Sequence, residues 1–226
     1  MKPTSPIGLA NLGPLAQLKA GRLPERLLRL FVGLWLYGLA IALMIEGAVG
    51  ASPWDVFHLG VSHHLPLSFG TVMILTAVAV LLAWIPLRQM PGLGTLANTL
   101  LLGPFADLSL AWLATPEGLP LRAAYLLAGV VLCAIATALY IGAQLGPGPR
   151  DGLMTGLARR TGWSIRSIRT LIEVSVLAIG VVLGGVVGVG TLVFAFGVGP
   201  LTQFFLRYLV VRLEKPATVA LEGETR

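Results

Sequence analysis

Apolar stretches of about 20 residues recur six times along this chain and predict six membrane-crossing helices. A helix needs about 20 mostly apolar residues to cross the hydrocarbon core of a bilayer. Two further helical segments, 53–64 and 149–160, are too short to cross, and each follows the first span of a group of three. The predicted spans are Leu27–Val49, Ser68–Leu87, Leu93–Leu113, Leu121–Leu145, Ser164–Leu183 and Val187–Val210.

The second group of three spans repeats the first at an offset of 96 residues. The offset holds without a gap from the pair Gly33/Gly129 to the pair Leu113/Leu209, with about 23 identities in 81 pairs. Each unit contains three spans, an odd number, so the second unit enters the membrane from the opposite side. We therefore expect an all-α membrane protein in which two inverted three-helix repeats, 27–114 and 121–211, follow a cytoplasmic segment 1–26 and precede a cytoplasmic tail 212–226.

The motif Gly-x-x-Pro-x-Asp marks the start of both short helices. It occurs as Gly50, Pro53 and Asp55 and again as Gly146, Pro149 and Asp151. Proline suits the first helical position, and an aspartate in the first turn meets the positive end of the helix dipole. Ser52 and Gly148 precede the prolines as candidate N-caps. Three interpretations stay open for the aspartates: capping groups, a cation or proton site, or parts of a simple turn.

Charge gives the topology a direction. The chain is 56% hydrophobic and 12% charged, whereas soluble domains are about a quarter charged. In the six-span arrangement nearly all flanking basic residues fall on the side of the two termini, and only Arg122 falls on the other. By the positive-inside rule both termini are expected in the cytoplasm. This pattern does not indicate a nucleic-acid partner.

Ionisable residues within the predicted spans are the candidates for function. Glu173 is expected near the middle of the fifth span, one helical turn after Arg169. An intramembrane carboxylate is costly and points to a site or to a buried ion pair, and both interpretations stay open. The candidate substrate or ion pathway comprises Asp55, Asp151, Glu173, Arg169, Arg150, Asn98, Gln144 and Glu46, with Gly50, Pro53, Gly146 and Pro149 as the structural motif.

Other residue types exclude several classes of site. Cys133 is the only cysteine, and His58, His63 and His64 lack the spacing of a shared helix face, so no metal and no other cofactor are expected. No nucleotide-binding loop or nucleophile–base motif is present, so an enzyme is not expected. Gly180, Gly184 and Gly188 repeat at four-residue spacing and predict a close-packing surface, within the bundle or between subunits of a homo-oligomer.

Four stretches resemble the bacterial YczE/YyaS/YitT family of integral membrane proteins, most nearly its YczE-like branch. They are 50–55, 148–154, 169–174 and 188–195. The resemblance covers about residues 27–210 and implies a bacterial cytoplasmic-membrane protein, with no assigned substrate or catalytic residue. Together with the inverted repeat it favours a secondary transporter or exporter of small molecules, with its site between the repeats. A membrane protein that scaffolds or regulates a partner and a channel are the alternatives.

Overall fold

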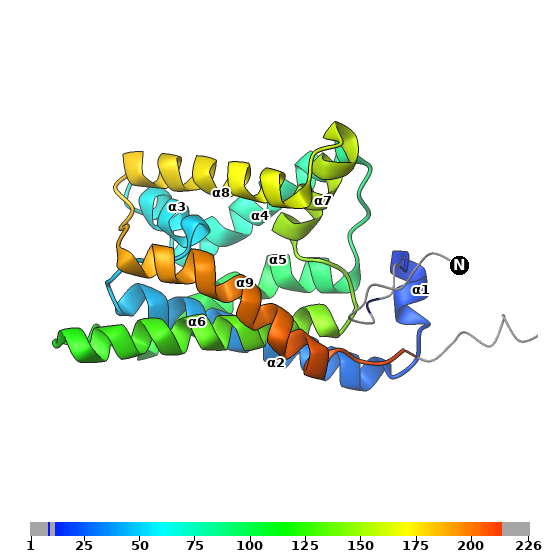
Figure 1. Ribbon diagram of the computed structural model, residues 1–226, viewed down its shortest axis with the longest axis horizontal. Coiled ribbons are helices and arrows are strands. Elements are labelled where there is room, and N and C mark those ends of the chain that lie inside the picture. The colour runs from blue at the N-terminus through cyan, green and yellow to red at the C-terminus, as the bar shows by residue number, and fades with distance from the viewer. Residues whose placement is uncertain (1–8, 10–11, 214–226) are drawn as a thin grey trace, which may run out of the picture.

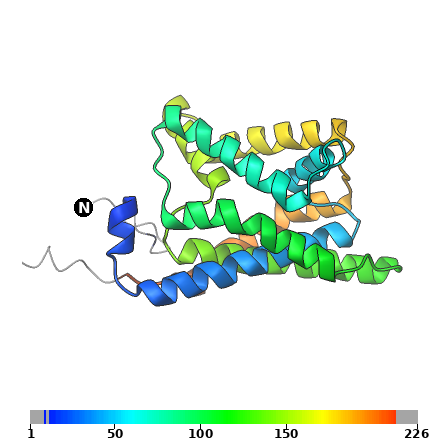
Figure 2. The ribbon, with the colours of Figure 1, turned by 180° about the vertical axis from the view of Figure 1, so that it is seen from behind.

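The computed structural model describes residue 9 and residues 12–213, and this part of the chain is helical apart from its connections. The long helices run broadly along the longest axis of the molecule, and α3 and α7 are short (Figures 1 and 2). The helices are α1 (Pro14–Leu18), α2 (Leu23–Glu46), α3 (Pro53–Ser62), α4 (Phe69–Leu87), α5 (Leu93–Trp112), α6 (Leu119–Gly142), α7 (Pro149–Thr161), α8 (Ile165–Val182) and α9 (Val189–Leu209).

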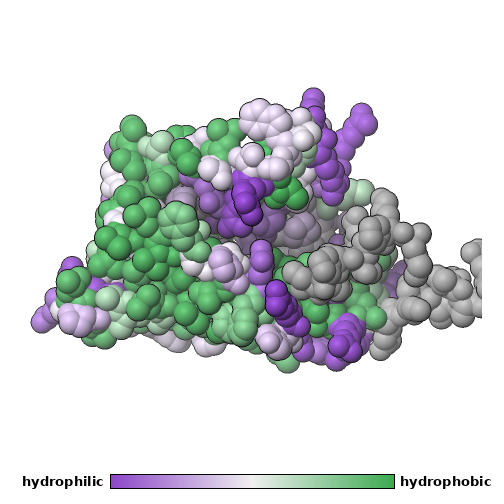
Figure 3. Space-filling model, viewed as in Figure 1, coloured by the Kyte–Doolittle hydropathy of each residue, from purple (hydrophilic) through white to green (hydrophobic). Residues whose placement is uncertain are grey.

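Each predicted span corresponds to one long helix, and each predicted short segment to one short helix. Four of the described helices, α2, α4, α6 and α9, are long and apolar enough to cross a membrane. The remaining long helices carry more polar residues, and α8 contains three charged side chains within 18 residues. Six spans therefore stay a prediction, and most of the predicted tail 212–226 lies outside the described residues. Figure 3 shows the broad apolar surface over α6, α8 and α9, interrupted by polar residues between α8 and α9.

The centre of the fold is the contact between α2 and α6. Gly33 on α2 lies against the backbone of Tyr140, and Gly129 on α6 lies against that of Ala40. A Cβ at either glycine would crowd the opposite helix, so the two glycines let the helices approach closely. Helix α5 packs on α2, and α9 packs on α6. The main hydrophobic core lies among these helices and includes Ile41, Met44, Leu102, Val130, Cys133 and Phe194.

The turns before α3 and α7 have the same unusual backbone. Ala48 and Gln144 have φ of 51° and 55°, and Gly50 and Gly146 have φ of 117° and 120°. Residues other than glycine rarely adopt a φ near 120°, which explains the glycine at positions 50 and 146. These pairs are 96 residues apart, so the repeat in the sequence corresponds to a repeated backbone conformation here.

Each of these turns is hydrogen-bonded to a helix of the other half. The Gly190 amide of α9 donates to the carbonyl of Val49, at 2.8 Å. The Gly94 amide of α5 donates to the carbonyl of Leu145, at 2.7 Å. Gly188 and Gly92 precede these helices, and a Cβ at either would collide with the same two carbonyls. The two Gly-x-Gly-Thr sequences at 92–95 and 188–191 thus serve as docking sites for the turns.

The two halves differ where their last two helices meet. Helix α4 packs on α5, whereas α8 and α9, the corresponding pair, make at most marginal contact. Gly70 of α4 lies directly against Gly103 of α5. The positions 96 residues later are Arg166 and Gly199, and nothing lies within 4 Å of a Cβ built on Gly199. Replacement of a small residue by arginine thus accompanies the separation of α8 from α9.

The buried side chain of Arg26, near the start of α2, joins the two halves at the end of α6. Arg26 is 0% exposed, and its guanidinium donates to the carbonyls of Ala143 and Gln144, each at 2.8 Å. It also donates to the carbonyl of Gln17, at 2.6 Å. Carbonyls at the end of a helix lack partners within it, so Arg26 supplies donors to the end of α6.

The glycines of the predicted close-packing surface are used within the chain. Gly180 of α8 lies against the backbone of Phe57 in α3, and Gly188 lies against Val49. Gly184 and Gly188 follow α8 and are not part of it, because the helix ends at Val182. The predicted helical stripe is therefore wrong for these two residues, and a homo-oligomer stays a prediction.

Candidate functional site

A cavity lined by both apolar and charged side chains lies between the two halves and consists of two adjoining pockets. The small pocket, about 20 Å³, is lined by α3, α4, α5 and α7, and the large pocket, about 210 Å³, by α2, α5, α6, α7, α8 and α9. The two pockets share Asn98, Leu102, Pro149 and Arg150. We call both together the central cavity. Its large pocket lies where α8 and α9 separate.

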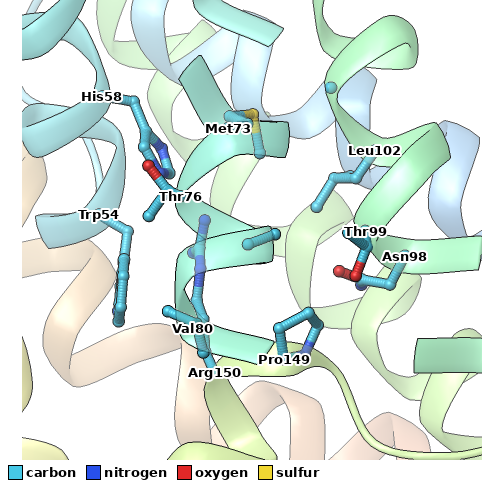
Figure 4. A pocket seen from close by; sticks show the side chains of 12 residues that line it. Trp54, His58, Met73, Thr76, Val80, Asn98, Thr99, Leu102, Pro149 and Arg150 are labelled. Carbon is cyan, nitrogen blue, oxygen red and sulfur yellow. The ribbon is translucent and has the colours of Figure 1, made fainter. Parts of the chain in front are cut away.

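Arg150 and Trp54 face each other in the central cavity. The Arg150 guanidinium carbon lies 4.6 Å from the centroid of the Trp54 ring, a distance typical of cation–π contact. Figure 4 shows the Arg150 side chain extending from α7 alongside Trp54, while Asn98 and Thr99 lie on the opposite side. Arg150 is preceded by Pro149 at the first position of α7, whose N-cap, Gly148, has no side chain to occupy the helix end.

The two motif aspartates accept hydrogen bonds from hydroxyl groups. The Tyr140 hydroxyl donates to the carboxylate of Asp151, at 2.8 Å, and the Ser52 hydroxyl donates to that of Asp55, at 2.5 Å. We expected each carboxylate to cap its helix or to pair with a basic neighbour. The prediction of Ser52 as the N-cap of α3 is confirmed, because its side-chain oxygen accepts from the Asp55 amide. Among basic groups, His58 is nearest to Asp55, with Nδ1 3.9 Å from the carboxylate.

His58 is fully buried and lines the small pocket. Neither of its ring nitrogens has a hydrogen-bond partner in the described chain. Burial lowers the pKa of this imidazole, which lies on the short helix α3, and favours its neutral form. From the sequence we considered His58 together with His63 and His64 and found no shared helix face. The structure separates it from them, because His64 instead contacts the carbonyl of Leu183.

The predicted pair of Arg169 and Glu173 is present on α8. Arg169 Nε lies 2.8 Å from Glu173 Oε1, one turn along the helix. The Arg169 side chain is 48% exposed and also lines the large pocket, whereas that of Glu173 is 22% exposed. Glu173 is thus joined to the cavity through Arg169.

The other pathway candidates divide between the cavity and its surroundings. Asn98, Arg150, Asp151 and Arg169 line the central cavity, together with the motif residue Pro149. Gln144 lies outside its lining, donates to the carbonyl of Val211 and belongs to the turn before α7. Glu46 accepts a hydrogen bond from Thr115 at the end of α2. The sequence interpretation missed Tyr37, Trp54 and His58, because buried aromatic residues are also normal in a core.

The fold defines the class of molecule: its long apolar helices, of which four in the described chain could cross a bilayer, are those of an integral membrane protein. Residues 24–207 match the family of unknown function DUF6198, and the chain belongs to this family. An uncharacterized protein of Haemophilus influenzae is 39% identical over 184 residues, which cover 81% of this chain and 84% of that relative.

Two relatives from Bacillus subtilis confirm the resemblance seen in the sequence. The uncharacterized membrane protein YczE is 35% identical and the uncharacterized protein YyaS 29% identical, over 78% and 77% of this chain and 83% and 89% of theirs. No solved structure matches the chain significantly.

Proposed function

We propose that this protein is a secondary transporter or exporter of small molecules, with its site in the central cavity. The observation that carries the proposal is the position of the cavity between two halves with equivalent backbone. Trp54 and Arg150 occupy equivalent positions of the repeat and both line it, as do Leu102 and Val198. Inverted-repeat transporters bind their substrates at such an interface.

The unequal closure of the two halves supports alternating access. The close contact of Gly70 with Gly103 seals α4 against α5, and the corresponding helices α8 and α9 stand apart. In the proposed six-span topology, with both termini in the cytoplasm of a bacterial cell, the gap between α8 and α9 opens the large pocket to the cytoplasm. If α4 and α5 separated while α8 and α9 came together, the cavity would open to the other side of the membrane.

A transporter is preferred to a channel because the part of the cavity between α3, α4, α5 and α7 is narrow. The small pocket, about 20 Å³, has room for about one water molecule. Permeation therefore needs a change of conformation, as in carriers.

Flux measurements test the proposal. The purified full-length protein would be reconstituted into liposomes, and currents or radiolabel uptake recorded for small organic anions, cations and neutral molecules. We expect flux of one class, lost in Arg150→Gln and kept in Arg159→Gln, which changes an exposed arginine of the same helix. If a compound bound to the folded protein but was never transported, the proposal would be wrong and a regulatory or scaffolding role would take its place.

A further inference from the structure

Donor groups without partners gather in the small pocket. The indole Nε1 of Trp54 has no hydrogen-bond partner in the described chain, although the residue is only 6% exposed. His58 is 0% exposed and also has no hydrogen-bond partner at either ring nitrogen in the described chain. Its neutral imidazole offers one donor and one acceptor, and its Nδ1 lies 3.9 Å from the carboxylate of Asp55. The indole N–H of Trp54 can only donate, and because a buried donor left unpaired is costly, it indicates a bound acceptor.

Arg150 adds a positive charge that the described chain leaves unpaired. The two other cavity charges have partners, since Arg169 binds Glu173 and Asp151 accepts from Tyr140. Arg150 stacks on Trp54, a contact that covers one face of the guanidinium and leaves its N–H edges available. These edges match the two oxygens of a carboxylate.

The equivalent positions in the first half show that this charge is specific to one side. Arg150 corresponds to Trp54, and Arg169 corresponds to Met73, which also lines the small pocket. A basic residue is therefore present at these cavity positions only in the second half. Asp151 adds a negative charge to the wall, but its hydrogen bond from Tyr140 reduces its effect on a neighbouring anion.

We propose that the central cavity binds a small organic carboxylate, an inference that rests on the proposed function. Arg150 holds the carboxylate edge-on, and Trp54 Nε1 donates to the oxygen that enters the small pocket. The remainder of the molecule lies in the large pocket against Tyr37, Phe194 and Val198. A cavity of about 150 Å³ admits a benzene-sized molecule, so the large pocket, about 210 Å³, has room for an aromatic or short aliphatic acid.

Three isosteric probes test the charge requirement: benzoate, neutral benzamide and cationic benzamidinium. Their binding to the purified full-length protein in detergent would be measured by calorimetry, with acetate as a smaller acid. We expect benzoate to bind at least about tenfold more tightly than benzamide, because only benzoate pairs with the guanidinium. Benzamidinium should not bind measurably.

Variants assign the binding to the named groups. Arg150→Gln should remove the preference for benzoate. Arg150→Lys should keep part of it, because lysine retains the charge but cannot donate two parallel hydrogen bonds as the planar guanidinium does. Trp54→Phe should weaken benzoate binding while keeping an aromatic platform. Arg159→Gln should bind as the parent does. Thermal melting of each variant shows whether it is folded.

The outcomes separate this inference from transport itself. Equal affinity for benzoate and benzamide, tighter binding of benzamidinium, or no binding of benzoate and acetate would overturn it and leave water as the partner of Trp54. Flux of a neutral or cationic compound in liposomes would then still support the proposed function. Carboxylate binding that depends on Arg150, without flux of any acid, would support the site and contradict transport.

Discussion

The guanidinium of Arg150 stacks on the ring of Trp54 at 4.6 Å, and these residues occupy the same position in the two repeat units. Both residues line the central cavity. The first half supplies an aromatic surface there, and the second half supplies a charge. The chemistry of the proposed site thus depends on a difference between the two sequence repeats.

Replacement of Asp151 by alanine should destabilise the protein, whereas replacement by asparagine should not. Asp151→Ala and Tyr140→Phe remove the same hydrogen bond and should each cost about 1–3 kcal/mol. Asp151→Asn keeps an acceptor and should melt near the parent temperature. A double-mutant cycle between positions 140 and 151 measures the coupling. Additive effects would show that the hydroxyl and carboxylate do not interact. A fully stable Asp151→Asn variant without transport would instead identify the carboxylate as an ion or proton site.

Glu173→Gln should leave the protein folded and change transport. The substitution removes the negative charge that pairs with Arg169, whose side chain is about half exposed and can be solvated in the large pocket. The freed guanidinium adds positive charge beside the proposed site, so the apparent KM for an acid should fall and the dependence of flux on pH should change. Substrate titrations at several pH values measure both. A variant that expresses poorly but transports normally would make the pair purely structural.

Substitutions at the docking glycines should be far more harmful than substitution at a free glycine. Gly92→Ala and Gly188→Ala place a methyl group against the Leu145 and Val49 carbonyls and should each cost about 1–3 kcal/mol. Gly199→Ala is the matched control, because this helical glycine has nothing within 4 Å and alanine favours the helix. Melting temperatures in detergent compare the three. Equal stability of all three variants would contradict the described docking.

Arg26→Leu should destabilise the fold by at least about 2 kcal/mol, because it strands buried carbonyls at the end of α6. Arg22→Leu is the control. Arg22 forms a partly exposed pair with Glu25, for which about 1 kcal/mol or less is expected. Thermal or denaturant unfolding would compare the two variants. A smaller loss for Arg26→Leu than for Arg22→Leu would contradict the role assigned to this buried side chain.

Labelling of single cysteines tests the six-span topology. In a Cys133→Ala background, Ser62→Cys should react with an impermeant reagent in intact cells, because the end of α3 is expected outside. Gln89→Cys, in the connection between α4 and α5, should react only after lysis. The reverse pattern would show that the topology is inverted. Labelling of both positions in intact cells would show that α4 does not cross the membrane between them.

Local rules explain why the helices and their caps were predictable. Apolar length defined the long helices, and proline with a preceding Ser52 or Gly148 defined the start of each short helix. The repeat also predicted the equivalent turns. The partners of Asp55 and Asp151 were not predictable in this way. Asp55 accepts from Ser52, a local candidate for another role, and Asp151 accepts from Tyr140 of the preceding helix.

The cavity depended on contacts that no local pattern encodes. From the sequence we did not include Trp54 or His58 among the candidate site residues, and only the approach of α4, α5 and α7 encloses them. Arg26 read as one of several positive charges before the first span. Its burial follows from the arrival of the end of α6, more than one hundred positions later in the chain.

The reciprocal docking of the two turns has a consequence for biosynthesis. The two hydrogen bonds are alike in space but not along the polypeptide: Gly94 and Leu145 are 51 positions apart, and Val49 and Gly190 are 141 apart. A ribosome that has just released the start of α7 has already supplied both partners of the first bond. The second must wait until almost the entire chain has emerged. The turn before α3 therefore spends most of translation without its final neighbour.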